Sequence, residues 1–153
     1  MALDTALIKA GYAAVEPHGT AVTGYFYEHL FEHNPAVRPL FAEHIGEQRD
    51  RLWTTLGVLV AKLDDLGTVV KLLEGLGRRH VGYGALPEHY PAVGASLLAA
   101  LEYFAGPEAW TSEMAAAWTE LYGVVAETMI GAAAQVAAVE HELKQDQEQE
   151  QAA

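Results

Sequence analysis

The sequence contains no cysteine and few basic residues, and both shortages limit what the protein can do. Without cysteine among its 153 residues, disulfides, thiolate metal sites, iron–sulfur clusters and cysteine nucleophiles are excluded. The 9 basic residues stand against 21 acidic ones, which gives a formal net charge of -12 at pH 7. Because this charge opposes approach to phosphate backbones and anionic membrane surfaces, we expect no nucleic-acid partner.

Long apolar runs are also missing. The amino end has no basic segment followed by an apolar stretch, as a secretory signal requires. Stretches without a formal charge fall short of the ~18 residues needed to cross a bilayer. We therefore expect a cytoplasmic protein that does not insert into membranes.

Apolar residues recur at three- and four-residue steps along most of the chain, which predicts an all-α architecture of about seven helices. No strand-like alternation is present. The length fits one domain over residues 1–140, followed by an acidic polar tail over 141–153 that is either a helical extension or disordered. The predicted helical segments are 4–15, 22–33, a tight turn at 35–41, 47–63, 68–80, 89–104 and 111–139.

His80 is the first candidate for chemistry. Helical spacing places it on one face with Val69, Leu72 or Leu73, and Leu76, so its imidazole projects toward the side of the helix that must be buried. A histidine in such a position is most often a packed residue with one hydrogen bond. Metal ligation is the alternative, and His80 by itself does not decide between them.

Two further polar residues occupy inward positions. Tyr27 lies beside Leu30 and Phe31 on the inner side of its helix, and Gln48 lies four residues before Leu52. Alone, each has an ordinary interpretation, as a core aromatic or an amide at the edge of the core. A haem protein needs an imidazole that can bind the iron, and it needs polar groups that can hydrogen-bond a small ligand. His80 offers the imidazole, and the phenol of Tyr27 and the amide of Gln48 offer the polar groups.

Several motifs in order then carry a family resemblance. Segments 26–31 (FYEHLF), 34–41 (NPAVRPLF), 76–80 (LGRRH), 89–94 (HYPAVG) and 117–124 (AWTELYGV) resemble single-domain bacterial haemoglobins and the globin domains of flavohaemoglobins. The LGRRH and AW-x-x-LYG segments are also similar to neuroglobin, though less closely. The resemblance covers most of the chain and implies a globin fold around haem b (protoporphyrin IX iron), held non-covalently because there is no cysteine to attach it.

The resemblance assigns roles to individual residues. His80 becomes the proximal iron ligand and Phe41 the aromatic that wedges the haem at the corner. Tyr27, Gln48 and Leu52 form the distal pocket, where a phenol and an amide donor would slow the loss of O₂ and Leu52 would limit access. A second histidine ligand, as in neuroglobin, would need histidine at position 48; nearby His44 keeps that arrangement open.

The proximal side departs from the flavohaemoglobin pattern. There a tyrosine and a buried glutamate orient the proximal imidazole, and the resemblance places Tyr90 at the tyrosine and Ala133 at the glutamate. We therefore expect His80 to donate its other ring nitrogen to a backbone carbonyl near Leu76, with a weak push onto the iron. Arg79 is a candidate for pairing with a haem propionate, as is Arg78, although both are equally well explained as surface charge.

The remaining histidines are expected to be solvated. They lie in predicted loops or beside charged neighbours, at positions 18, 29, 33, 44, 89 and 141. His29 and His33 are spaced for one helix face and could bind a metal, but the sequence shows no third ligand.

The implied function is reversible binding of O₂, and of NO and CO, at a five-coordinate ferrous iron for oxygen storage, transport or scavenging. The alternative is a nitric oxide dioxygenase that depends on a separate reductase; weak peroxidase activity is less expected because of the weak proximal push. A helical interaction module without haem is a third hypothesis. The sequence leaves monomer and homodimer open.

Overall fold

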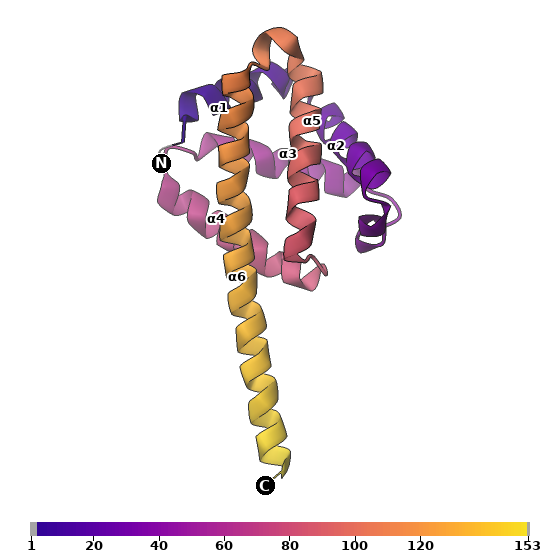
Figure 1. Cartoon of the computed structure of the whole chain (residues 1–153), viewed down its shortest axis with the longest axis vertical. Helices are drawn as coiled ribbons and strands as arrows, with labels where there is room; N and C mark the ends of the chain where they lie inside the picture. The colour runs from indigo at the N-terminus through magenta and orange to yellow at the C-terminus, as the bar shows by residue number, and fades with distance from the viewer. Residues whose placement is uncertain (1–2, 153) are drawn as a thin grey trace.

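The computed structural model describes residues 3–152, with the side chains of residues 137 and 150–152 left aside (Figure 1). Among these residues all regular structure is helical, which confirms the predicted all-α class. Six α-helices and the 3₁₀ segment η2 account for the seven predicted segments. The elements in order are α1 (Thr5–Val15), η1 (Glu16–His18), α2 (Thr20–His33), η2 (Pro35–Leu40), α3 (Gly46–Ala61), α4 (Leu66–Gly82), η3 (Pro87–His89), α5 (Tyr90–Ala109) and α6 (Ser112–Ala152).

Side-chain caps explain where three helices begin. The Asp4 carboxylate accepts a hydrogen bond from the Leu7 backbone N–H at 3.1 Å, and the Thr111 hydroxyl accepts one from Met114 N–H at 3.2 Å. Asp65 accepts from the Thr68 N–H at 3.2 Å. Because Asp65 is the cap, α4 begins at Leu66, two residues before the predicted start.

Some helix ends differ from the predictions. The α4 helix continues two residues past His80 to Gly82, so the histidine lies inside the last turn and not at the break. In α5, a non-helical Gly106 (φ 82°, ψ 164°) produces a kink, after which a short helical segment runs to Ala109. The tail forms a helical extension of α6 as far as Ala152, and Ala153 lies outside the described residues, as do Met1 and Ala2.

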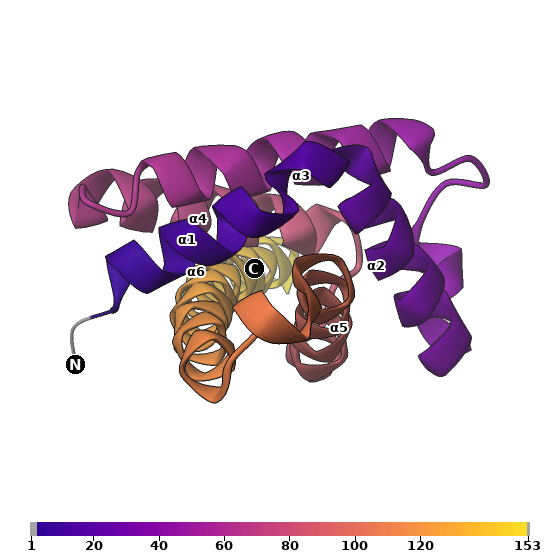
Figure 2. The same ribbon diagram turned by 90° about the horizontal axis from the view of Figure 1, so that it is seen from above.

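The helices pack as crossed pairs. The α4 helix packs against α6 and α2 against α5, while α1 and α3 cross the other side of the molecule (Figure 2). The α4 helix approaches α6 closely at Gly77, where an added methyl group would lie 2.4 Å from the Met129 carbonyl oxygen. Only glycine allows the two backbones to come this near, which fixes where α4 lies on α6.

The buried side chains fall into two clusters. The larger cluster joins α1, α2, α3, α5 and α6 around residues such as Phe26, Leu30 and Trp118. The smaller cluster joins the end of α3 to α4, α5 and α6, through Leu59, Leu73 and other residues. Tyr27 belongs to the first cluster, and Phe41 and Leu52 pack against it. His80 lies on α4, the helix that supplies Val69 and Leu73 to the second cluster.

The α6 helix is unusually long and extends well beyond the rest of the molecule (Figure 1). By length and composition it is the single helix among the described residues that could cross a membrane, although it contributes to the core. Trp118, Leu121 and Met129 are buried against neighbouring helices. This packing identifies its first half as a core helix of a folded domain.

Candidate functional site

Tyr27 and Gln48 are brought together from α2 and α3. The Gln48 amide Nε2 donates a hydrogen bond to the Tyr27 hydroxyl at 3.1 Å, and the Tyr27 side chain is only 2% exposed. Burial raises the pKa of Tyr27 to about 12, and the Gln48 hydrogen bond and nearby Arg51 oppose this shift. The phenol therefore keeps its proton at neutral pH and can donate it to a third group.

An aromatic cluster surrounds this pair. Phe41 meets Tyr27 edge-to-face with ring centroids 5.6 Å apart, and Phe31 lies 5.3 Å from Phe41 and 5.8 Å from Tyr27. Leu52 is half-buried against the same cluster of apolar residues. The structure thus places Tyr27, Gln48 and Phe41 side by side, and the roles that the resemblance gives them and Leu52 stay predictions.

Thr23 fixes the beginning of α3, and sequence reasoning did not identify it. Its side chain is fully buried, and its hydroxyl donates to the Arg49 carbonyl at 3.0 Å and contacts the Thr20 carbonyl at 3.2 Å. Because Arg49 follows Gln48 directly, this hydrogen bond fixes the position of Gln48 along the axis of α2. A threonine on an apolar helix face was the signal that could have pointed to it.

His80 lies half-buried in the last turn of α4. Its Nδ1 is 2.6 Å from the Leu76 carbonyl oxygen, which confirms the predicted hydrogen bond one turn earlier. Since a carbonyl only accepts, Nδ1 carries the hydrogen and Nε2 keeps the lone pair. Burial lowers the pKa of His80, with the Leu76 hydrogen bond opposing the shift and Arg79 adding to it, so the imidazole is neutral near pH 7.

A contact between η2 and the turn after α4 connects the segment that carries Phe41 with the segment after His80. An added methyl group at Gly84 would lie 3.4 Å from Leu40 Cδ2, so η2 comes within van der Waals reach of the turn that follows α4. Leu40 immediately precedes Phe41. The Tyr83 ring also packs edge-on against His80 at 5.3 Å between centroids. Phe41 and His80 therefore lie on neighbouring parts of the same region.

Tyr90 lies near the start of α5 among the smaller cluster of buried side chains. Its side chain is 9% exposed, and its buried hydroxyl has no hydrogen-bond partner among the described residues. Its backbone carbonyl accepts a hydrogen bond from the Tyr122 hydroxyl at 2.6 Å. Ala133, which stands at the position of the expected glutamate, is half-buried on α6 one turn after Met129 and offers no acceptor.

The two arginines beside His80 have different surroundings. Arg79 is exposed, and its guanidinium lies over Gly75 on its own helix. Arg78 instead lines a hollow of about 310 Å³ between α4 and α6, together with Val136, Val139 and others. Arg79 thus keeps its candidate role, whereas Arg78 lies beside α6.

The expectation that the other histidines are solvated is wrong in part. His18, His33, His44 and His141 are exposed. His29 is half-buried, with its Nδ1 2.8 Å from the hydroxyl of the buried Ser96. His89 is also half-buried and accepts a hydrogen bond from the Leu86 N–H. The partner of His29 comes from another helix, whereas the partner of His89 is a backbone group three residues earlier.

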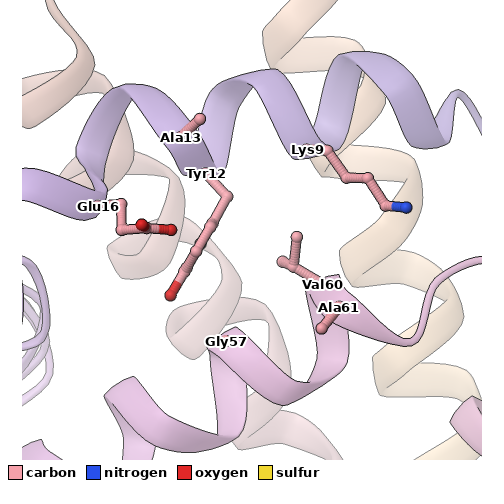
Figure 3. Close-up of a pocket in the computed structure, with 7 residues that line it drawn as sticks. All are labelled: Lys9, Tyr12, Ala13, Glu16, Gly57, Val60 and Ala61. Carbon is pink, nitrogen blue, oxygen red and sulfur yellow. The ribbon is translucent and has the colours of Figure 1, made fainter.

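A second hollow lies away from these residues (Figure 3). It has a volume of about 470 Å³ and lies between α1 and α3, where Lys9, Tyr12 and Glu16 face Gly57 and Val60. It contains none of the predicted site residues. The Lys9 ammonium pairs with Asp64 outside this lining, and because both side chains are exposed the pair contributes little to stability.

The geometry agrees with what is found in known proteins. The globin family model matches residues 24–129 of this chain. The chain belongs to the globin family. It is 36% identical over 128 residues to a flavohaemoprotein of Chromobacterium violaceum, and 35% identical over 134 residues to flavohaemoprotein A of Dictyostelium discoideum. These matches cover 82% and 84% of the chain, which spans about a third of the length of either relative (31% and 32%).

Solved globin structures are similar as well. A bacterial globin of Campylobacter jejuni shares 26% identity at a TM-score of 0.77, over 88% of this chain and 96% of that one. An engineered carbene transferase, made from a proposed nitric oxide dioxygenase of Rhodothermus marinus, shares 29% identity at a TM-score of 0.79, over 88% of this chain and 94% of the other. The fold class and the predicted family are thereby confirmed.

Haem binding is expected of globins, and the residues present fit this group. His80 offers a neutral imidazole whose Nδ1 is held by a carbonyl, which is how iron-ligating histidines are usually oriented. Tyr27 and Gln48 supply hydrogen-bond donors in an apolar surrounding, and Phe41 supplies an aromatic face. The imidazole would bind the iron on one side of a haem, and the phenol and the amide would hydrogen-bond a small ligand on the other side.

Proposed function

We propose that this globin binds haem b non-covalently through His80 and reversibly takes up O₂ for storage, transport or scavenging. The observation that carries the proposal is the Gln48–Tyr27 hydrogen bond of 3.1 Å in an apolar surrounding. Haem supplies a ferrous iron that takes up O₂, NO or CO. The chain supplies the hydrogen-bond donors and the apolar surroundings that favour one of these ligands over another.

On the distal side, Tyr27 is the proposed donor to the bound ligand. Its proton stays on the oxygen at neutral pH, because burial raises the pKa to about 12. Gln48 donates to the same oxygen and so orients the hydroxyl hydrogen away from itself. A ligand with negative partial charge, such as O₂, gains most from this donor, and Leu52 narrows the access to it.

On the proximal side, His80 is the proposed iron ligand through Nε2. The Leu76 carbonyl holds the imidazole in the tautomer with hydrogen on Nδ1. A neutral carbonyl is a weaker hydrogen-bond acceptor than a carboxylate, so it raises the electron donation of the imidazole less. Ala133 cannot supply that carboxylate. We therefore propose a weak electron push onto the iron, which favours holding a ligand over breaking its bonds. Phe41 is the proposed wedge and Arg79 the proposed partner of a propionate, with Tyr90 lining the proximal side.

The second candidate function is nitric oxide dioxygenase activity with a separate reductase that restores the ferrous state. Two observations favour it: relatives that are named flavohaemoproteins, and a structural neighbour made from a proposed nitric oxide dioxygenase. The distal tyrosine and glutamine serve this reaction equally well, because they also hold O₂ before NO arrives. The difference between the two functions lies in re-reduction, which the chain's own residues do not supply.

One set of measurements separates these functions. Absorption spectra of the ferrous protein should change on exposure to O₂ and revert when O₂ is removed, over many cycles. Rapid irreversible conversion to the ferric form would contradict the oxygen-binding proposal. Catalytic consumption of NO with a supplied electron donor would favour the dioxygenase, whereas a single equivalent consumed without turnover would argue against it.

A further inference from the structure

A pair of histidines near the end of α2 is not used by the proposed function. His29 and His33 are four residues apart, so they lie above one another on the same face of the helix. Their rings stack with centroids 4.0 Å apart and planes inclined by 20°. His33 is exposed and His29 half-buried, which leaves the pair open to solvent on one side.

Both imidazoles are held by hydrogen bonds at the same ring nitrogen. His33 donates from Nδ1 to the His29 carbonyl oxygen at 2.9 Å. His29 Nδ1 lies 2.8 Å from Ser96 Oγ on α5, whose side chain is fully buried. With Nδ1 occupied in each ring, Nε2 is the nitrogen left to bind something else.

The electrostatic surroundings favour a cation at this place. His33 is the last residue of α2, where the unpaired carbonyls of the helix end carry negative partial charge. The exposed Glu32 lies between the two histidines in sequence, and the whole chain carries a formal charge of -12.

We infer that His29 and His33 chelate one divalent transition-metal ion through their Nε2 atoms, with water completing its coordination. Imidazole nitrogens suit zinc, nickel and copper, and Cu²⁺ should bind most strongly of the three. Two nitrogens at about 2.0–2.1 Å from one ion are roughly 3 Å apart. The two rings stack with planes inclined by 20°, so both must turn out of the stack to direct their Nε2 lone pairs at one ion.

The site is an open, two-ligand site. Among the described residues no group of three or more histidine or acidic side chains converges, so water must occupy the other positions. Such a site exchanges its metal readily and is not a structural centre. It lies on the face of α2 opposite Tyr27, where His29 borders α5, and it is chemically independent of the proposed haem ligand on α4.

The test is a metal titration of the full-length protein as purified. Calorimetry with Zn²⁺ should show one equivalent bound at this pair, Mg²⁺ should show none, and Cu²⁺ should give an electron paramagnetic resonance spectrum with two nitrogen ligands. His33→Gln should lower the affinity at least about 10-fold, since loss of a ligand costs no less than loss of its supporting partner. Ser96→Ala, which removes the partner of His29, should lower it about 10-fold.

His141→Gln is the matched control, because His141 is another exposed helical histidine that has Gln145 and no second histidine one turn away. It should bind Zn²⁺ like the unmodified protein. The inference is overturned if His33→Gln binds Zn²⁺ with unchanged affinity and stoichiometry, or if His141→Gln loses as much as His33→Gln. His29→Gln provides a second variant, and circular dichroism on each confirms that the helices are intact.

Discussion

The amide of Gln48 donates to the hydroxyl of Tyr27 at 3.1 Å, and this joins two residues that are 21 positions apart on different helices. The contact depends on the crossing of α2 and α3, which Thr23 fixes through the Arg49 carbonyl. It leaves the tyrosine hydrogen free to point at a third group. The predictions below follow from this arrangement and from its counterpart around His80.

Tyr27→Phe should speed the dissociation of O₂ by roughly 10- to 100-fold, because a hydrogen bond to a charged acceptor is worth about 1.5–3 kcal/mol. Gln48→Leu should have a smaller effect, since it disturbs only the orientation of the hydroxyl. CO dissociation should change much less than O₂ dissociation in both variants. Stopped-flow or flash-photolysis kinetics measure these rates, and equal changes for CO and O₂ would show that the two residues act by steric restriction alone.

Gly77→Ala should destabilise the fold by about 1–3 kcal/mol, because the new methyl group meets the Met129 backbone, which cannot move aside easily. It should also loosen the haem, since it shifts the helix that carries His80. Gly75→Ala is the control on the same helix: its methyl group meets only the end of the Arg79 side chain at 3.6 Å. There the better helix propensity should stabilise by up to about 1 kcal/mol. Urea unfolding measures both, and equal effects would disprove the close-packing argument.

Tyr122→Phe and Tyr90→Phe should change stability in opposite directions. The Tyr122 hydroxyl donates to the Tyr90 carbonyl at 2.6 Å, so its loss should cost about 1 kcal/mol. The Tyr90 hydroxyl is buried without a partner among the described residues, so its removal should be neutral or stabilising. Denaturant midpoints of the two variants compare them directly. A large loss in Tyr90→Phe would mean that this hydroxyl has a partner once haem is bound.

Acid should release the haem through His80. A proton competes with the iron for Nε2, and burial lowers the pKa of this imidazole below its ordinary value of 6.5. The unfolded chain therefore binds a proton that the folded chain does not, so the free energy of unfolding decreases as the pH falls below about 6.5. The Soret absorbance followed during acidification should decline in this range and below it. His44→Gln should behave like the unmodified protein, and an earlier loss of haem in that variant would instead implicate His44 as a ligand.

Local signals in the sequence accounted for most of the fold. Caps at Asp4 and Thr111, and the apolar periodicity, depend on residues within one or two helical turns, so they can be recognised without knowing the fold. The His80–Leu76 hydrogen bond was predictable for the same reason. The joining of Tyr27 with Gln48 could be predicted only through the family resemblance, because periodicity places each on a face but does not say which faces meet.

Contacts between residues that are far apart in the sequence could not be predicted. The approach of Gly77 to Met129 spans 52 positions by their numbering, and nothing near either residue marks it. Ser96 looks like one small residue among several in α5, yet it is the partner of His29. The orphaned hydroxyl of Tyr90 is likewise visible only once every neighbour is in place. In each case the pairing is set by helix crossing and not by local propensity.

The central claim is that His80 binds haem iron. Titration of the protein with haemin, followed by the Soret band in the unmodified protein and in His80→Ala, tests it most directly. The account predicts one equivalent of tightly bound haem in the unmodified protein, and loss or severe weakening of binding in the variant. No Soret band in the unmodified protein after haemin is added, or an unchanged six-coordinate spectrum in His80→Ala, would contradict it.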